Sequence, residues 1–402
     1  MMNKKVNCTE KAKLDASAVS FRILVLLFWT QHTIFSFIVE IVERLPVVGY
    51  MSDLVMPIMF LFSIVFAMPW MVSYIRVKDV MLYFVFLSIV LLTIVIYPDT
   101  SKYIIKDIQR ILIASVPIYF IGVSYSHELC KRDLYYASLI GVFVMFLYQF
   151  YALSNGRELS SDNMSAAYYT LPSVMYLIHW TFEHKKIHNY VAVVLGFVLM
   201  LAFGTRGPIL ALLIFLAISI LISTFKSRSI FVKLFFLIVI SFFVFVLSVE
   251  SILLNLSKRL SELFEDAGFS VRIMDLFIEG EIAHSSGRDL LSEQILEKIS
   301  QNPIIGYGFM GDRPILGFYV HNIILELWCS FGVILGSVFI LLMTVIPLKA
   351  SIKKHDKIIS NFIIMLFCMV FVKLMFTSSY VVEPYLFLML GISVNNLRRK
   401  DL

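Results

Sequence analysis

Long apolar runs separated by short polar segments recur along almost the whole chain, and they constrain its fold more than any other feature. A transmembrane helix needs about 20 consecutive, mostly apolar residues to cross the bilayer core. The sequence therefore predicts an all-α, polytopic integral membrane protein with about twelve transmembrane helices. We expect these spans near residues 22–39, 54–74, 80–97, 108–125, 134–153, 164–181, 189–204, 208–224, 231–249, 322–347, 358–376 and 380–396.

The composition agrees with a membrane protein and excludes an ordinary soluble domain. Of the 402 residues, 59% are hydrophobic and only 15% are charged, whereas a soluble domain has about 25% charged residues. A chain of this length cannot hide so much apolar surface from water. The formal net charge is +6. Because basic residues in a membrane protein mostly set its orientation, we do not take this charge as a sign of nucleic-acid binding and expect no nucleic-acid partner.

The distribution of Lys and Arg predicts the orientation of the chain. Twelve spans place both termini on the same side, and the loops on that side carry 21 of the 34 Lys and Arg residues. Because short cytoplasmic loops are enriched in these residues, we expect a multi-pass protein with cytoplasmic N- and C-termini.

One extracytoplasmic loop is much longer than the others. Residues 1–249 hold the first nine spans, residues 250–321 form this loop, and residues 322–402 hold the last three spans. Loops of such length are usually functional. We expect a surface helix around 253–263 and a second helix from Ser286 to about Ser300, with Leu291, Ile295 and Ile299 as its apolar stripe. Pro303 ends this helix, and a glycine-rich stretch of turns follows.

Two arginines stand where helices are expected to begin. Arg206 lies in Gly204-Thr205-Arg206-Gly207-Pro208, and Arg288 lies in Ser285-Ser286-Gly287-Arg288-Asp289. A helix N-terminus attracts anions, and an arginine offers paired donors to phosphate oxygens. Both sites suit a diphosphate. The alternative is that Arg206 extends to the lipid headgroups and that Arg288 belongs to an ordinary capped helix.

A third cluster, His321-Asn322-Ile323-Ile324-Leu325-Glu326, stands at the expected outer end of the tenth span. A histidine at the membrane boundary can accept a proton near pH 7, and Glu326 lies one helical turn deeper, where it can orient or polarise the imidazole. The alternative is that His321 and Asn322 only cap the span. His284 is a second candidate base in the outer loop.

These clusters together resemble the O-antigen ligase and polysaccharide polymerase family of bacterial membrane glycosyltransferases. The resemblance covers roughly residues 190–345. It is carried by Thr205-Arg206-Gly207, Ser286-Gly287-Arg288, Asn302-Pro303-Ile304-Ile305-Gly306-Tyr307-Gly308, His321-Asn322, Leu325-Glu326, Gly332 and Gly336, in this order.

The resemblance implies an enzyme of the bacterial inner membrane that acts, at its outer face, on an oligosaccharide carried by undecaprenyl diphosphate. It implies that Arg206 and Arg288 hold the diphosphate and that His321 takes the proton from the acceptor hydroxyl. Glu326, Asn322, Arg272 and Arg313 are further candidates for substrate binding. No metal motif is present in the sequence, and the diphosphate is a good leaving group, so we expect neither a metal nor another cofactor.

Three functions remain open on the sequence. The first is a polymerase of lipid-linked repeat units for O-antigen, capsule or exopolysaccharide, which the pattern from Gly311-Asp312-Arg313 to Leu325-Glu326-Leu327-Trp328 favours. The second is a ligase that transfers the polymer to lipid A-core. The third is a non-enzymatic transporter or flippase, suggested by charged residues within spans, such as Lys373, Glu326 and Arg110. Expected partners are membrane lipid and, in the same pathway, a chain-length regulator and a flippase.

Overall fold

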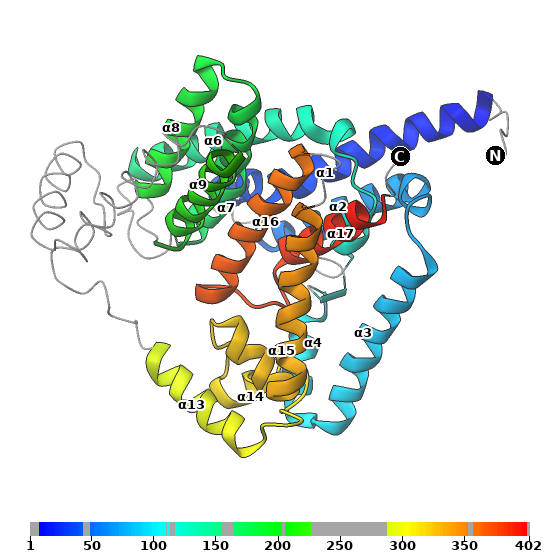
Figure 1. Cartoon of the computed structure of the whole chain (residues 1–402), viewed down its shortest axis with the longest axis vertical. Coiled ribbons are helices and arrows are strands. Elements are labelled where there is room, and N and C mark those ends of the chain that lie inside the picture. The colour runs from blue at the N-terminus through cyan, green and yellow to red at the C-terminus, as the bar shows by residue number, and fades with distance from the viewer. Residues whose placement is uncertain are drawn as a thin grey trace, which may run out of the picture. The chain divides into compact units, whose positions relative to one another are not determined.

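The computed structural model describes residues 8–42, 49–109, 111–112, 117–154, 164–202, 206–226, 288–352 and 357–399. All the regular elements among the described residues are helices, and no strand occurs there, which confirms the all-α class (Figure 1). The expected surface helix at 253–263, the ninth span and the candidate residues Arg272 and His284 lie outside the described residues.

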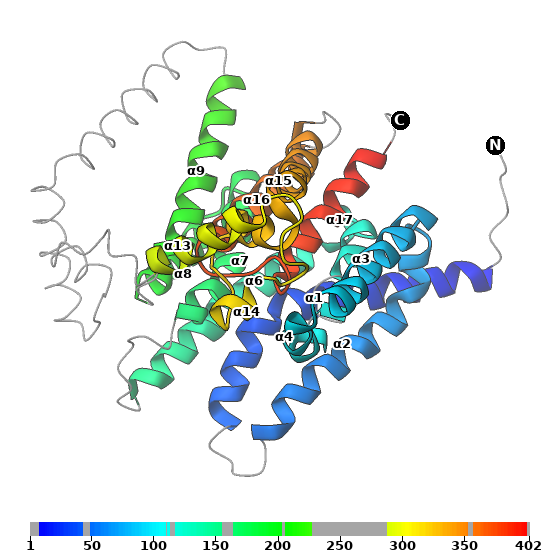
Figure 2. The ribbon, with the colours of Figure 1, turned by 90° about the horizontal axis from the view of Figure 1, so that it is seen from below.

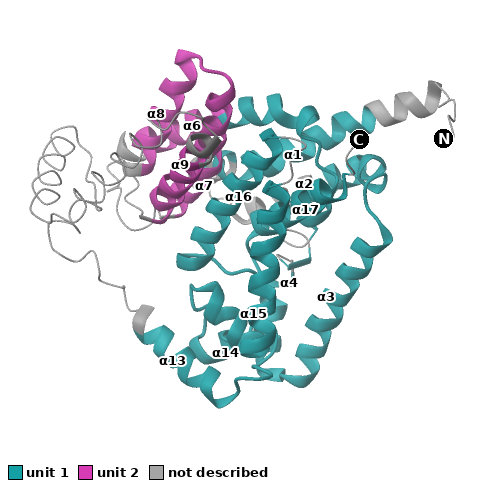
Figure 3. Cartoon of the chain, in the orientation of Figure 1, with its two compact units in different colours: residues 1–138, 287–402 teal, residues 139–286 magenta. Residues whose placement is uncertain are grey.

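The chain forms two compact units, residues 1–138 with 287–402 and residues 139–286 (Figure 3). The helix α6 (His127–Ser154) begins in the first unit and ends in the second. The second unit also contains α7 (Met164–Glu183), α8 (Ile187–Ala202) and α9 (Arg206–Lys226). The first unit contains α1 (Cys8–Val42), α2 (Gly49–Val72), α3 (Val77–Ile96), α4 (Pro98–Gln109), α5 (Ile118–Val123), α13 (Arg288–Gln301), α14 (Arg313–Leu316), α15 (Ile323–Ile352), α16 (Lys357–Phe376) and α17 (Pro384–Arg398).

Four helices among the described residues are long and apolar enough to cross a membrane. They are Val77–Ile96, His127–Tyr151, Ile323–Ile352 and Lys357–Phe376, and each coincides with an expected span. Shorter apolar helices cover Leu61–Val72, Ile187–Met200 and Gly207–Leu221. The structure thus supports a membrane protein but does not confirm the count of twelve spans.

The span expected at 108–125 differs from the described structure. Helix α4 ends at Gln109, and α5 covers only Ile118–Val123, with residues 113–116 outside the description. Lysines and aspartates recur along α4, so this helix is too polar to lie in the bilayer core. The apolar run after it includes Pro117, which stands at the N-cap of α5 and interrupts helical hydrogen bonding.

Close packing of small residues organises the first unit. Helices α1 and α2 lie side by side (Figure 2), and α15, α16 and α17 contact one another. Helix α5 packs against α17, where a side chain at Gly122 would meet the Leu388 carbonyl oxygen and Gly391. Such contacts between small residues are typical of helices packed in membranes.

In the second unit, α7 packs against both α8 and α9. A side chain at Gly196 of α8 would meet Val174 of α7, and one at Gly207 of α9 would meet the Tyr168 hydroxyl of α7. Both glycines therefore let neighbouring helices approach closely.

The second helix expected in the long loop is confirmed over its described part. Helix α13 runs from Arg288 to Gln301, and two residues of its expected apolar stripe, Ile295 and Ile299, are buried against Val320, Leu325 and Cys329. This cluster fixes α13 to the first turns of α15. The glycine-rich stretch after α13 consists of turns, with positive φ angles at Gly306 and Gly308.

Helix α15 is broken at Gly332, where φ is 75° and ψ is 167°. A regular helix would join the Val333 N–H to the Cys329 carbonyl. Instead, the Val333 N–H donates to the Pro303 carbonyl at 2.7 Å, and the Cys329 carbonyl accepts the Tyr307 N–H at 2.8 Å. The turn segment 303–307 thus occupies the break and satisfies both backbone groups.

We predict that Gly332→Ala strongly destabilises the protein. The backbone conformation of Gly332 is accessible almost only to glycine, and an added Cβ would collide with the Ile304 carbonyl. The matched control is Gly317→Ala, which also has a positive φ, 82°, but has open space around the added atom. We expect Gly317→Ala to cost only the conformational strain, about 1–2 kcal/mol. Thermal unfolding of both purified variants in detergent measures the difference, and equal melting temperatures would contradict the docking of segment 303–307.

Candidate functional site

The candidate site is built around residues 310–322, the segment that connects the turns after α13 to α15. Its two ends have unusual backbone conformations, because Met310 has φ 61° and His321 has φ 57°. Left-handed φ angles are uncommon for residues other than glycine and are often found at functional sites. Between them lies α14, a single turn that ends at Leu316 and has Gly317 as its C-cap.

The Arg313 guanidinium is the centre of a buried polar network. Its Nη1 donates to the carboxylate of Asp312 and, at 2.6 Å, to Glu326 Oε1, and its Nη2 donates to Ser379 Oγ at 2.6 Å. Arg313 is 4% exposed, and Asp312 and Glu326 are fully buried. The network therefore joins α14, the first turn of α15 and the loop between α16 and α17.

Backbone and hydroxyl donors complete the coordination of the two carboxylates. The Ser379 hydroxyl donates to Glu326 Oε1 at 2.5 Å, and the Tyr380 N–H donates to Glu326 Oε2 at 3.3 Å. The Val320 N–H donates to Asp312 Oδ2 at 3.0 Å. These donors matter because two buried carboxylates share one guanidinium, and a buried charge needs both a counter-charge and hydrogen bonds.

The surroundings keep Arg313 charged. Burial alone lowers the pKa of its guanidinium, but Glu326 and Asp312 outweigh burial, so its pKa is raised above the ordinary value.

Tyr319 connects this network to His321. Its ring lies 5.5 Å from Arg313 Cζ, and its hydroxyl donates to the Thr377 carbonyl at 3.0 Å. The ring centroids of Tyr319 and His321 are 4.3 Å apart, at an angle of 58°. His321 is half-buried, and the Phe318 ring lies 6.1 Å from its centroid.

Asn322 caps α15. Its Oδ1 accepts the backbone N–H groups of Ile324 at 2.9 Å and Leu325 at 3.3 Å. This is the ordinary role of an asparagine before a helix. The hydrogen bonds of Asn322 in the structure are therefore those of a helix cap, as the alternative interpretation expected. Glu326 hydrogen-bonds Arg313, Ser379 and Tyr380 rather than His321, which makes any influence on the imidazole indirect.

The two arginines expected at helix N-termini do stand there. Arg206 is the first residue of α9, in the second unit, and Arg288 is the first residue of α13, in the first unit. The conformations of their side chains are outside the description, so their proposed contacts with a diphosphate remain predictions.

Comparison with known families identifies the region that holds these residues. Residues 191–340 match the family model described as O-Antigen ligase. This region is therefore similar to the O-antigen ligase family. The match confirms the resemblance noted in the sequence. No curated protein and no solved structure matches the chain.

The O-antigen ligase region includes every candidate site residue, from Arg206 to Glu326. It also includes Asp312, which the sequence analysis named only as part of the pattern that favours the polymerase, and Tyr319, which it did not name. The pair Asp312-Arg313 gave a weak signal, because adjacent opposite charges in an apolar chain often belong to a buried network. Ser379 lies outside the region, and nothing in the sequence connects it to Glu326.

Other charges in or near the spans are also paired within the first unit. Lys373 Nζ lies 2.8 Å from Glu383 Oε2. Arg398 donates to both carboxylate oxygens of Asp79, at 2.7 and 2.6 Å. Two of the charges that suggested a transport pathway, Lys373 and Glu326, thus form internal ion pairs, while Arg110 lies outside the described residues.

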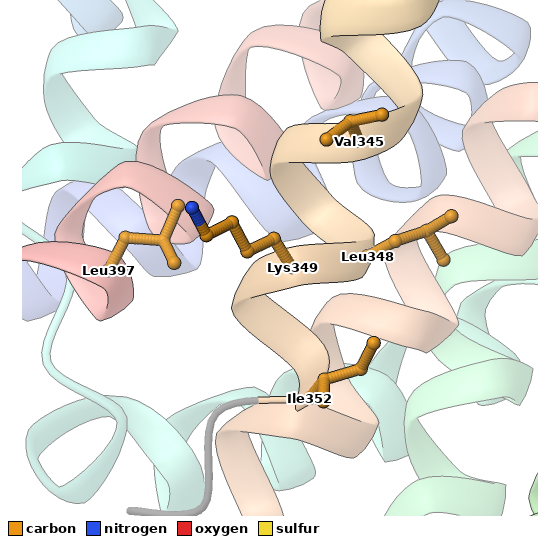
Figure 4. Close-up of a pocket in the computed structure, with 5 residues that line it drawn as sticks. All are labelled: Val345, Leu348, Lys349, Ile352 and Leu397. Carbon is orange, nitrogen blue, oxygen red and sulfur yellow. The ribbon is translucent and has the colours of Figure 1, made fainter.

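A pocket of about 640 Å³ lies near the other end of α15 (Figure 4), lined by Val345, Leu348, Lys349, Ile352 and Leu397. Its walls are apolar apart from Lys349. More than twenty residues of α15 separate it from His321, which corresponds to roughly 30 Å along a helix. Neither a histidine nor a carboxylate lines it, so we do not place the chemistry there.

We predict that Arg313→Met severely destabilises the protein. The substitution leaves Glu326 and Asp312 buried without their counter-charge, and removing one partner of a buried ion pair costs about 3–5 kcal/mol. The double variant Arg313→Met/Glu326→Gln removes one of the stranded charges and should recover a substantial part of the loss. Thermal unfolding of the wild type and the two variants tests this, and a single variant as stable as the wild type would exclude a structural role for the pair.

Proposed function

We propose that this protein is a polysaccharide polymerase, which joins undecaprenyl-diphosphate-linked oligosaccharide repeat units at the outer face of the inner membrane. The observation that carries the proposal is the position of His321 within the O-antigen ligase region. This half-buried histidine stands at the start of a candidate membrane span and is flanked by a buried ionic network. A glycosyltransferase of this family needs a base at such a boundary, because its donor is anchored in lipid.

In the proposed reaction, His321 takes the proton from a hydroxyl group of the acceptor sugar. The hydroxyl oxygen forms a bond to the anomeric carbon of the donor sugar, and the bond from that carbon to the diphosphate oxygen breaks. Undecaprenyl diphosphate leaves with the electron pair. A neutral imidazole is suited to this step near pH 7, and the reaction is balanced without a metal or another cofactor.

By family resemblance, Arg206 and Arg288 hold the diphosphate of the donor. Their places at the first positions of α9 and α13 support this role, since helix N-termini and arginine side chains both favour phosphate oxygens. Arg272 and Asn322 remain candidates for contacts with sugar or phosphate. The buried contacts of Arg313 and Glu326 favour a supporting role for these two residues.

The alternative within the same family is an O-antigen ligase, which transfers the finished polymer to lipid A-core. The pattern from Gly311 to Trp328 favours the polymerase. The proposed setting includes cytoplasmic termini and, in the same pathway, a flippase that supplies the donor and a chain-length regulator. A transport function is less well supported, because the charges of Lys373 and Glu326 are paired within the first unit.

Reconstitution separates the two reactions. We expect the purified full chain, in vesicles with an undecaprenyl-diphosphate-linked repeat unit as its sole substrate, to produce a ladder of longer lipid-linked oligosaccharides. A protein that is inactive on this donor alone, but transfers sugar when lipid A-core is added, would be a ligase. Movement of the intact donor across the vesicle membrane without bond formation would instead support a transporter.

We predict that His321→Ala, His321→Gln and His321→Asn all lose about 10²–10⁴ in the rate of bond formation, because none provides a general base. Asparagine is the control for the backbone, since it tolerates the left-handed conformation at residue 321 better than most residues. Initial rates are measured at matched amounts of folded protein, and donor binding is measured separately. An active His321→Asn variant would show that residue 321 is needed for its backbone conformation and not as a base. His284 would then be tested as the base.

A further inference from the structure

The imidazole of His321 depends on its neighbours for its orientation. Its own backbone has a left-handed φ, a conformation that persists in a residue other than glycine only when the surroundings enforce it. The preceding residue is fixed from one side, because the Val320 N–H donates to the buried Asp312 carboxylate. The side chain of Tyr319 adds the second constraint, since its ring lies next to the imidazole.

Tyr319 is itself held at two points. At one end of its side chain, the hydroxyl donates to the Thr377 carbonyl at 3.0 Å. The ring also lies near the Arg313 guanidinium, with 5.5 Å from Cζ to the ring centroid. Arginine commonly stacks on or lies over an aromatic ring. The Tyr319 side chain therefore contacts two segments of the first unit in addition to His321.

Arg313 cannot easily move away from the ring. Its two terminal nitrogens bond to Asp312, Glu326 and Ser379, and its side chain is 5% exposed. A substrate could reach this guanidinium only if these contacts opened. These contacts instead hold the Arg313 guanidinium in one position next to the Tyr319 ring.

We propose that Tyr319 is a positioning residue, which orients His321 for proton transfer and is itself fixed by Arg313. The inference rests on the proposed function, in which His321 is the base. It reassigns Arg313 and Glu326 from direct substrate contact to support of the site. Because displacement of a catalytic group by about 1 Å can cost up to 10²-fold in rate, this support has a measurable effect on turnover.

The test compares steady-state kinetics of Tyr319→Leu, Tyr319→Phe and Arg313→Lys with the wild type, using the full chain and the lipid-linked donor. Tyr319→Leu removes the ring, and we expect kcat to fall about 10- to 100-fold while the KM and binding of the donor stay within about threefold. Tyr319→Phe keeps the ring and should stay within about threefold of the wild-type kcat. Arg313→Lys keeps the positive charge but loses the planar group, and its kcat should fall to an intermediate value.

Tyr119→Leu is the matched control. The Tyr119 hydroxyl donates to Asp79 at 2.9 Å, and Asp79 is paired with Arg398. Tyr119 thus belongs to another tyrosine, carboxylate and arginine cluster of the same unit, without His321. We expect Tyr119→Leu to lower the melting temperature and to leave kcat unchanged.

A double-mutant cycle distinguishes positioning from direct contact with substrate. If Tyr319 acts through His321, then adding Tyr319→Leu to His321→Ala causes no further loss of rate. If the two losses multiply, or if Tyr319→Leu raises the donor KM while kcat is unchanged, Tyr319 contacts the sugar itself and the inference is wrong. Unchanged kinetics of Tyr319→Leu would also overturn it.

The same series shows whether the proposed function has failed instead. A His321→Ala variant with wild-type rate removes the base from the mechanism, whatever Tyr319 does. An inactive His321→Ala combined with a fully active Tyr319→Leu leaves the proposed function intact and removes only the positioning role. Donor binding confirms that each variant is folded. If Tyr319→Leu fails to bind donor, the test rests on Arg313→Lys alone. An unchanged kcat of Arg313→Lys overturns the inference. A lower kcat supports it, provided that the double variant Arg313→Lys/His321→Ala is no slower than His321→Ala.

Discussion

The ion pair between Arg313 and Glu326 is the centre of a network that reaches a distant segment of the chain. It connects the short helix α14 to the start of α15, and Ser379 extends the connection to the loop between α16 and α17. A buried ion pair contributes little net stability, because desolvation of both charges offsets most of their attraction. Its effect is on conformation, since few other arrangements of these segments would pair both carboxylates. The backbone that presents His321 follows from that requirement.

A comparison within the first unit shows how similar chemistry serves different purposes. Arg398 and Asp79 form a bidentate ion pair, and the Tyr119 hydroxyl donates to the same carboxylate. That cluster joins α3, α5 and α17, three helices that need only be held together. Around Arg313, by contrast, the partners hold the connection between two helices, which has little regular hydrogen bonding of its own. The ionic contacts there fix the backbone of the connection, as regular hydrogen bonding fixes the backbone of a helix or a sheet.

Local sequence patterns predicted the local parts of the site. Apolar periodicity and the position of Pro303 located α13. The expected helix starts singled out His321 and the two arginines, and the resemblance implied their roles. The contacts of Ser379 could not be predicted, because it lies 53 residues from Glu326 and a serine in a loop carries no signal of its own. The break at Gly332 was also missed, since the apolar run through 322–347 is the same for a straight and a broken helix. Its cause is a backbone segment inserted from elsewhere, which composition does not record.

The contacts of Thr377 and Ser379 have a consequence for the order in which the protein matures. Both residues lie in the loop between α16 and α17, the last two of the described helices. During synthesis, the segment with Arg313, Tyr319 and His321 leaves the ribosome well before this loop does. Until the loop between α16 and α17 is in place, Glu326 lacks its serine partner and Tyr319 lacks its carbonyl acceptor. A nascent or truncated chain that ends after α15 would therefore have all the residues of the O-antigen ligase region but not the complete set of contacts around the candidate site.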